Sequence, residues 1–291
     1  MNKAIFVAIP TLVVLSCHGP ARQNNTQSVN VSIAPQKFLI DRISEGKYNV
    51  NVVVKAGQNH ETYEPTPQQM VQLEQAGLYL MLCKDGFDQI WAQNIQQRNP
   101  AMEVVDLSEG VPLLETHYEC GDHDHGHHHH ASDPHLWISP STMKELAGNT
   151  YLALVRYFPN DSIALTKGYG HLKADIDHMD SLYRASLQPL PHRAFMIYHP
   201  VMGYVARDYG LQQLPIEIEG KEPSVNDIKQ LIANARGQNA KVIFIQQEYD
   251  TRNAQLIADE TGLAIETIHP MNEDWLTETQ LTLNKLIQAL K

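Results

Sequence analysis

Four histidines in this sequence stand where they could bind one metal ion. Three of them follow short apolar runs that are typical of β-strands, and the fourth lies in a compact Asp-Pro-His-Leu-Trp segment. In α/β proteins the loops at the carboxyl ends of the strands bring distant residues together. Imidazole nitrogens suit Zn²⁺ best, and they suit Cu²⁺, Ni²⁺ and Co²⁺ less specifically, whereas Mn²⁺ favours more carboxylate. The sequence therefore predicts a divalent metal site, with Zn²⁺ preferred over Mn²⁺, at His60, His135, His199 and His269.

A second concentration of histidines lies within residues 117–130, where Asp122, Asp124 and Gly126 separate several of them. Imidazoles in an acidic, flexible loop capture a cation weakly and raise its local concentration. The tract is internal, which argues against a purification tag. We expect an auxiliary, low-affinity site formed by His117, His123, His125, His127, His128, His129 and His130. His171, His178 and His192 follow no such pattern and are interpreted as surface or packing residues.

Strand-like and helix-like segments alternate along most of the chain, which predicts parallel sheets covered by helices. The alternation stops at residues 108–134, which are interpreted as an exposed disordered loop. A long apolar stripe from 163 to 187 predicts one helix, after which the alternation resumes. The expected fold is α/β, with two lobes joined by one long rigid helix and a metal site in the cleft between them. The expected strands are 29–33, 50–54, 78–83, 102–107, 195–198, 214–218, 242–246 and 264–268.

The composition and net charge of the chain argue against nucleic acid as a binding partner. The chain has 291 residues, 43% of them hydrophobic, and 22 Lys and Arg against 33 Asp and Glu give a net charge of −11. An acidic chain without a basic block lacks the field that neutralises phosphates, so nucleic acid is not an expected partner. The chain is expected to be a globular monomer.

The first residues resemble an export signal. An uncharged run from 4 to 16 is too short to span a bilayer and ends at Cys17, as in the lipobox of bacterial lipoproteins. We expect residues 1–17 to be the signal, with Cys17 lipidated, and 18–28 to be a flexible tether. An ordinary cleaved signal is the alternative. Cys83 is interpreted as a buried apolar side chain, not paired with Cys120.

Several motifs occur in an order that resembles the metal-specific solute-binding proteins of bacterial ABC importers, the ZnuA/TroA-like family. The similarity extends from about residue 30 to the C-terminus. It implies two α/β lobes, a linking helix, a metal between the lobes, and a histidine-rich loop in zinc-binding members. The matching stretches are 62–67, 133–140, 198–210 and 216–224.

The resemblance places His135 and His199 on ligand positions of the family. The first family histidine would occupy the position of Glu61, one residue after His60, so either residue could ligate; we favour His60. The fourth family ligand, commonly an aspartate before a proline, is His269 here. The expected lobes are 29–162 and 189–291, with 163–188 as the linking helix.

The function implied by the resemblance is an extracytoplasmic, membrane-anchored receptor that delivers Zn²⁺ to an ABC permease of the inner membrane. The alternatives are an adhesin-like lipoprotein or metal buffer that binds manganese or another divalent ion, and a zinc hydrolase. A hydrolase would need an open coordination position and a base such as Glu61 or Glu248. Because no HExxH motif is present, an enzyme is not expected.

Overall fold

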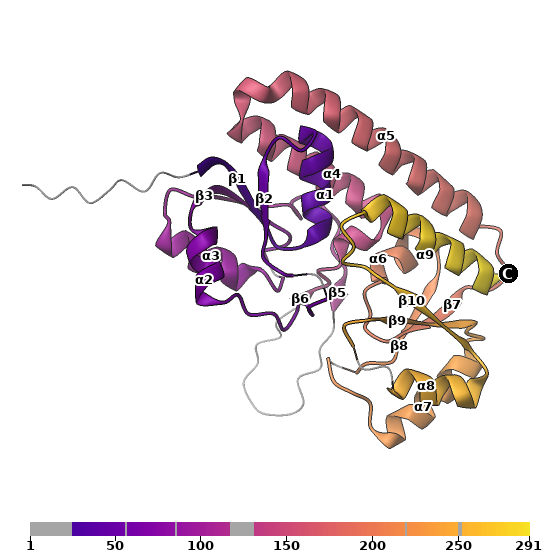
Figure 1. Cartoon of the computed structure of the whole chain (residues 1–291). Coiled ribbons are helices and arrows are strands. Elements are labelled where there is room, and N and C mark those ends of the chain that lie inside the picture. The colour runs from indigo at the N-terminus through magenta and orange to yellow at the C-terminus, as the bar shows by residue number, and fades with distance from the viewer. Residues whose placement is uncertain (1–24, 56, 85, 117–130, 219, 250–251) are drawn as a thin grey trace, which may run out of the picture.

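The computed structural model describes residues 25–291 apart from 56, 85, 117–130, 219 and 250–251. It consists of two α/β lobes joined by a long helix, which confirms the predicted fold class (Figure 1). The first lobe contains a parallel sheet with the strand order β2-β1-β3-β4. Its strands are β1 (Asn25–Val31), β2 (Asn49–Val52), β3 (Ala76–Met81) and β4 (Glu103–Asp106).

Helices cover both faces of the first sheet, and for this reason every residue of the central strand β3 is buried. Figure 1 shows α2 and α3 on one face, and α1 and α4 on the other. The helices are α1 (Ala34–Ser44), α2 (Pro67–Leu73), α3 (Gln89–Arg98) and α4 (Pro140–Tyr157).

The second lobe repeats this plan with the strand order β10-β9-β7-β8, again all parallel. Successive residues of β7 enter two different cores: Phe195 and Ile197 pack with α5, α6 and α9, whereas Met196 packs with α7 and α8. Such alternation is what a strand with period two requires. The elements are β7 (Ala194–Ile197), α6 (Gly203–Tyr209), β8 (Gln212–Pro215), α7 (Val225–Gly237), β9 (Val242–Gln246), α8 (Arg252–Thr261), β10 (Ala264–Ile268) and α9 (Trp275–Leu290).

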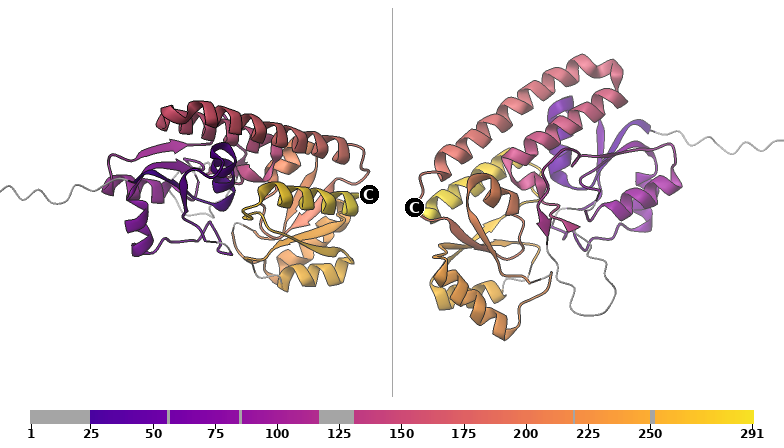
Figure 2. Two further views of the ribbon diagram at one scale, coloured as in Figure 1. Left: turned by 45° about the horizontal axis from the view of Figure 1, so that its top comes forward. Right: turned by 180° about the vertical axis from the view of Figure 1, so that it is seen from behind.

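Helix α5 (Ser162–Leu187) extends along both lobes, as the views in Figure 2 show. Its first half buries Leu165 and Leu172 in the core of the first lobe. Its second half buries Tyr183 and Leu187 in the core of the second lobe. A single helix with side chains in two cores holds the lobes at a fixed separation.

Two tryptophans add a second connection between the lobes. The indole of Trp137 donates to the Pro270 carbonyl at 2.8 Å, and the indole of Trp275 donates to the Trp137 carbonyl at 2.6 Å. Met271 and Trp275 pack in the core of the first lobe although they follow the last strand of the second. The C-terminal segment therefore contributes to both halves, and the expected boundary at residue 189 does not separate two independent cores.

Several strands are shifted by a few residues from their expected bounds, for example β8 at Gln212–Pro215 where 214–218 was expected, and two differences are larger. Strand β1 begins at Asn25, inside the segment expected to be a tether. The short strands β5 (Glu115–Thr116) and β6 (Ala131–Ser132) pair antiparallel inside the segment expected to be a disordered loop. Two-residue strands are too short to give a periodic signal, so they could not be recognised from the sequence. Among the described residues, no helix is long and apolar enough to cross a membrane.

Candidate metal centre

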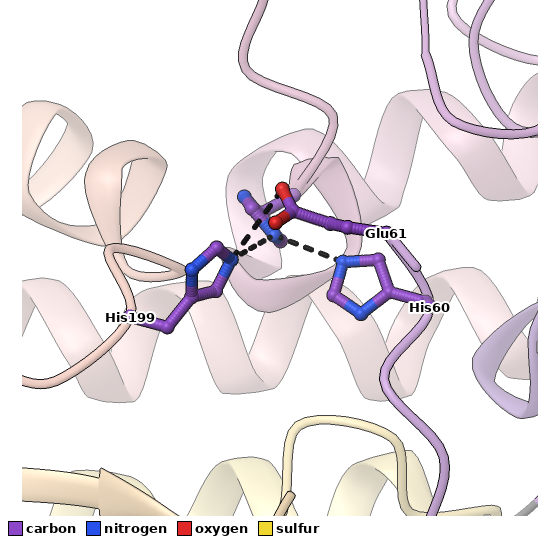
Figure 3. A group of neighbouring side chains, drawn as sticks. His60, Glu61 and His199 are labelled. Atoms are coloured by element: carbon purple, nitrogen blue, oxygen red, sulfur yellow. Dashed lines mark hydrogen bonds and ion pairs between the residues drawn. The ribbon is translucent and has the colours of Figure 1, made fainter. Parts of the chain in front are cut away.

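Three imidazoles converge at the cleft between the lobes. The Nε2 atom of His135 lies 3.1 Å from Nε2 of His60 and 3.3 Å from Nε2 of His199. All three side chains are almost completely buried, at 3–4% exposure. Figure 3 shows His60 and His199 directed toward the same point from opposite sides. The sequence prediction that these three histidines meet agrees with this geometry.

These distances fit a tetrahedral metal ion. With Zn–N bonds of about 2.0–2.1 Å, neighbouring nitrogens in a tetrahedral site are roughly 3.3 Å apart. Without a proton or a cation between them, the lone pairs of facing imidazoles would repel each other. The site is therefore arranged for a positive charge at its centre.

Glu61 supplies an oxygen to the same group. Its carboxylate lies 3.5 Å from Nε2 of His199. Each of His60, Glu61, His135 and His199 offers one ligand atom, and these four atoms all lie within 4.8 Å of one another. The Glu61 side chain is 29% exposed, far more than the imidazoles. Three nitrogens and one carboxylate form a donor set that suits Zn²⁺ better than Mn²⁺, because manganese prefers oxygen-rich octahedral sites.

His60 and Glu61 lie on the loop that connects β2 to α2. The start of α2 holds this loop, because Gln69 accepts from the Tyr63 hydroxyl at 2.9 Å and donates to the Val53 carbonyl at 3.2 Å. The His60 ring packs edge-on against Phe87, with the ring centres 4.8 Å apart. Burial lowers the pKa of His60 well below its usual value, and the neighbouring His135 and His199 lower it further. His60 therefore presents a neutral imidazole, the form that binds metals.

His135 directly precedes the short 3-10 helix η1 (Leu136–Ile138). The Asp133 carboxylate accepts from its Nδ1 at 2.7 Å and from its backbone amide at 2.9 Å. The Asp133 backbone amide in turn donates to the Leu114 carbonyl at 2.8 Å, beside the β5–β6 hairpin. Because the Nδ1 hydrogen is directed at a carboxylate, the Nε2 lone pair is left for the metal.

His199 follows β7 and is held in the same way. The Glu217 carboxylate lies 2.7 Å from its Nδ1, and the buried Gln246 side chain donates to its backbone carbonyl at 2.8 Å. Glu217 comes after β8 and Gln246 ends β9, so both neighbours of β7 in the sheet fix this ligand. Neither Asp133 nor Glu217 was among the residues predicted from the sequence to act at the site. An acidic residue two positions before His135 was a usable signal for Asp133. No local sequence pattern indicates a role for Glu217.

His269 lies outside the group of four although it follows β10 as predicted. Strand β10 is at the edge of the second sheet, two positions from β7, and neighbouring strands are about 4.8 Å apart. Its backbone amide is fixed by the Glu278 carboxylate at 2.9 Å. His269 is thus not part of the group of ligand atoms in this structure, whereas the loop after β2 brings His60 into it.

Other predicted residues have different positions. His171 and His178 are exposed on α5, and His192 contacts Asn239 at the surface, so their interpretation as surface residues is confirmed. Cys83 is completely buried, as expected. Cys17, Cys120 and the histidines of the auxiliary site between 117 and 130 lie outside the described residues.

Comparisons with known proteins agree with the fold. Residues 29–289 match the family model described as "ZnuA: Zinc-uptake complex component A periplasmic". The chain is 25% identical to the "High-affinity zinc uptake system protein ZnuA" of Bacillus subtilis, over 91% of this chain and 86% of that protein. This chain is also 21% identical to the "Zinc-binding lipoprotein AdcA" of Streptococcus pneumoniae. The match covers 94% of this chain but only 55% of that relative.

Solved structures give the same result. A structure described as "Crystal structure of ZnuA" superposes with a TM-score of 0.83 at 30% identity, covering 91% of this chain and 99% of the other. A zinc-bound ZnuA deletion mutant superposes with a TM-score of 0.82 at 31% identity, covering 91% of this chain and 98% of the other. With a family model that matches nearly the whole described chain, this protein belongs to the ZnuA family of periplasmic zinc-uptake components.

Proposed function

We propose that this protein is an extracytoplasmic receptor that binds one Zn²⁺ between its lobes and delivers it to an ABC permease. The observation that carries the proposal is the convergence of three buried Nε2 atoms, 3.1 and 3.3 Å apart, next to a carboxylate. The similarity to proteins named as zinc-uptake components supports zinc as the cargo.

The proposed ligands are His60, His135, His199 and Glu61. This set fills four positions and leaves no open one for a catalytic water, which disfavours the zinc hydrolase. The group contains both His60 and Glu61. We therefore propose that both bind the metal, where the sequence had left a choice between them.

The site also suits a protein that must release its cargo. Glu61 is the most exposed of the four ligands and lies on a loop, whereas His135 and His199 are each tied to a second carboxylate. A carboxylate that can leave the metal lets the affinity change when the receptor docks, and such a difference between states is what release requires.

Competitive titration with a chromophoric chelator tests the proposal. Wild-type protein should bind one tight Zn²⁺. His135→Ala or His199→Ala should weaken binding by at least about 100-fold, because each removes a ligand and even the loss of a partner behind a ligand costs about 10- to 100-fold. His269→Ala is the matched control and should leave the affinity of the tight site unchanged. A loss in His269→Ala equal to that in His135→Ala would contradict the proposed ligand set.

The remaining assignments extend the same proposal. Cys17 would carry a lipid anchor that keeps the receptor, a monomer, at the membrane outside the cytoplasm. The histidines between 117 and 130 would capture zinc weakly; in the sequence they precede β6, which ends directly before Asp133, the partner of the proposed ligand His135.

A further inference from the structure

Tyr249, in the second lobe, packs against the proposed metal ligand His199. It follows β9, and its ring lies almost parallel to the His199 imidazole, with the centres 4.8 Å apart and the planes at 14°. The ring of Tyr198 contacts it on a second side at 5.8 Å. Stacking of this kind restricts the rotation of the His199 ring.

The Tyr249 hydroxyl is buried and makes no regular hydrogen bond to any described residue. Buried hydroxyls nearly always have a partner, so one without a partner needs an explanation. The groups that act on it electrostatically belong to both lobes and include Asn59 and the carboxylates of Glu61, Glu217 and Glu248. Ionised carboxylates are acceptors only, so the phenolic hydroxyl can interact with them only as a donor.

Glu61 is the acceptor that such a donor fits. The three imidazoles are almost completely buried, so a bound ion exchanges with solvent past Glu61, the only ligand of the group with substantial exposure. A carboxylate that binds zinc through one oxygen leaves its second oxygen in need of a donor. The charged acceptor would make this hydrogen bond a strong one.

We propose that Tyr249 is a positioning residue of the metal centre, whose ring orients His199 and whose hydroxyl donates to Glu61 in the metal-bound state. By holding Glu61 on the ion, this contact between the lobes slows metal release. The inference rests on the proposed zinc-binding function.

The rate of Zn²⁺ release tests this role. Zinc-loaded full-length protein is mixed with excess chromophoric chelator in a stopped-flow instrument, for wild type, Tyr249→Phe, Tyr249→Ala, Glu61→Ala and the Tyr249→Phe/Glu61→Ala double variant. Tyr249→Phe keeps the ring and should release zinc roughly tenfold faster, because it loses one hydrogen bond to a charged group. Tyr249→Ala should release it faster still. In the Glu61→Ala background, Tyr249→Phe should change the rate by less than twofold.

Tyr151→Phe is the matched control, because it removes a hydroxyl that bonds Thr166 on the exposed α4–α5 surface, and it should release zinc at the wild-type rate. Release from Tyr249→Phe within twofold of wild type would overturn the role of the hydroxyl. An acceleration that persists in the Glu61→Ala background would overturn the assignment of Glu61 as its acceptor. If wild type bound no tight zinc, the proposed function would fail and this inference with it, whereas tight zinc with unchanged rates would overturn the inference alone.

Discussion

The carboxylates of Asp133 and Glu217 set the orientation of the His135 and His199 imidazoles. Asp133 and Glu217 each lie 2.7 Å from the Nδ1 atom of a ligand, and both are nearly buried. Each fixes the orientation of its imidazole and increases its basicity toward the ion. His60 is instead held by aromatic rings, with Phe87 at 4.8 Å and Trp137 at 5.4 Å. The three nitrogens are thus positioned by two kinds of contact.

Removing either carboxylate should weaken zinc binding without removing a ligand. We expect Asp133→Asn and Glu217→Gln each to lower zinc affinity by about 10- to 100-fold, the usual effect of losing a partner behind a metal ligand. Chelator competition measures the change. Asp175→Asn, which removes a carboxylate of α5 that pairs with Arg42 of α1, is the control and should bind like wild type. Unchanged affinity in both variants would show that the ligands are held by packing alone.

Asp88 gives a pH dependence to the stability of the fold. It is completely buried at the start of α3 and accepts from the Ser32 hydroxyl at 2.5 Å and the Leu82 amide at 2.6 Å. Burial raises its pKa to about 6 from 3.8. Between these values the folded chain holds a proton that the unfolded chain has released, so stability is full below pH 4 and falls as pH rises through 6.

Asp88→Asn should remove this dependence, because the amide does not titrate. From pH 4 to 7, the free energy of unfolding of wild type should fall relative to Asp88→Asn, by up to about 3 kcal/mol for a shift of roughly two pKa units. Urea unfolding at several pH values, without metal, measures the difference. Parallel pH profiles for the two proteins would contradict the assignment.

At the scale of single residues, the sequence was sufficient to predict that His60, His135 and His199 lie together, because histidines next to strands and in a compact motif are visible without a structure. It was not sufficient for Glu217, whose role depends on β8 lying next to β7. The sequence also could not show that His269 follows an edge strand, because the order of strands in a sheet cannot be read from the local sequence.

The contact between helices α1 and α5 depends on one glycine. A β-carbon at Gly168 would overlap the backbone carbonyl of Ile43, whereas one at Gly170, on the same helix, would meet nothing within 4 Å. The two helices therefore approach each other more closely than side chains would allow. Because α5 enters both cores, this contact fixes the end of the linking helix in the first lobe.

Gly168→Ala should destabilise the protein, and Gly170→Ala should not. Overpacking against a backbone costs about 1–3 kcal/mol, and alanine in an open helical position gains up to about 1 kcal/mol over glycine. Thermal unfolding of the two variants gives the comparison. If Gly168→Ala were as stable as Gly170→Ala, the close approach of α1 and α5 would be contradicted.

The sequence predicted whole elements well where the apolar pattern is long. The strands at 242–246 and 264–268 have the predicted bounds, and the long helix begins within one residue of its expected start. The β5–β6 hairpin was missed, since its pairing depends on residues that are separate in sequence. The first strand begins earlier than expected because Asn25–Ser28 carries few apolar residues, and its place in the sheet comes from pairing with β3.

The whole molecule has two sheets with the same strand order. In each lobe the first strand lies between the second and the third, and ligands in such sheets bind beyond the carboxyl ends where the order reverses. The ligand His199 follows the first strand of its lobe, and Tyr249 follows the third. In the first lobe His60 follows β2 and His135 precedes η1, so the group of ligand atoms combines residues from both lobes.

Zinc binding should change the overall shape very little. Helix α5 and the Trp137 and Trp275 hydrogen bonds link the lobes, so a wide hinge motion would break packing in two cores. Small-angle X-ray scattering of the metal-free and zinc-loaded protein should give the same radius of gyration within error. A contraction of several ångströms on adding zinc would show that the linking helix is not rigid.

The place of Trp137 has a practical consequence. Its indole ring lies 5.4 Å from both His60 and His135, so any cation that binds there changes the electric field at the ring. We therefore expect tryptophan emission to change when a metal binds, and to change much less in a Trp137→Phe variant. Such a signal would let occupancy be followed in real time without a dye.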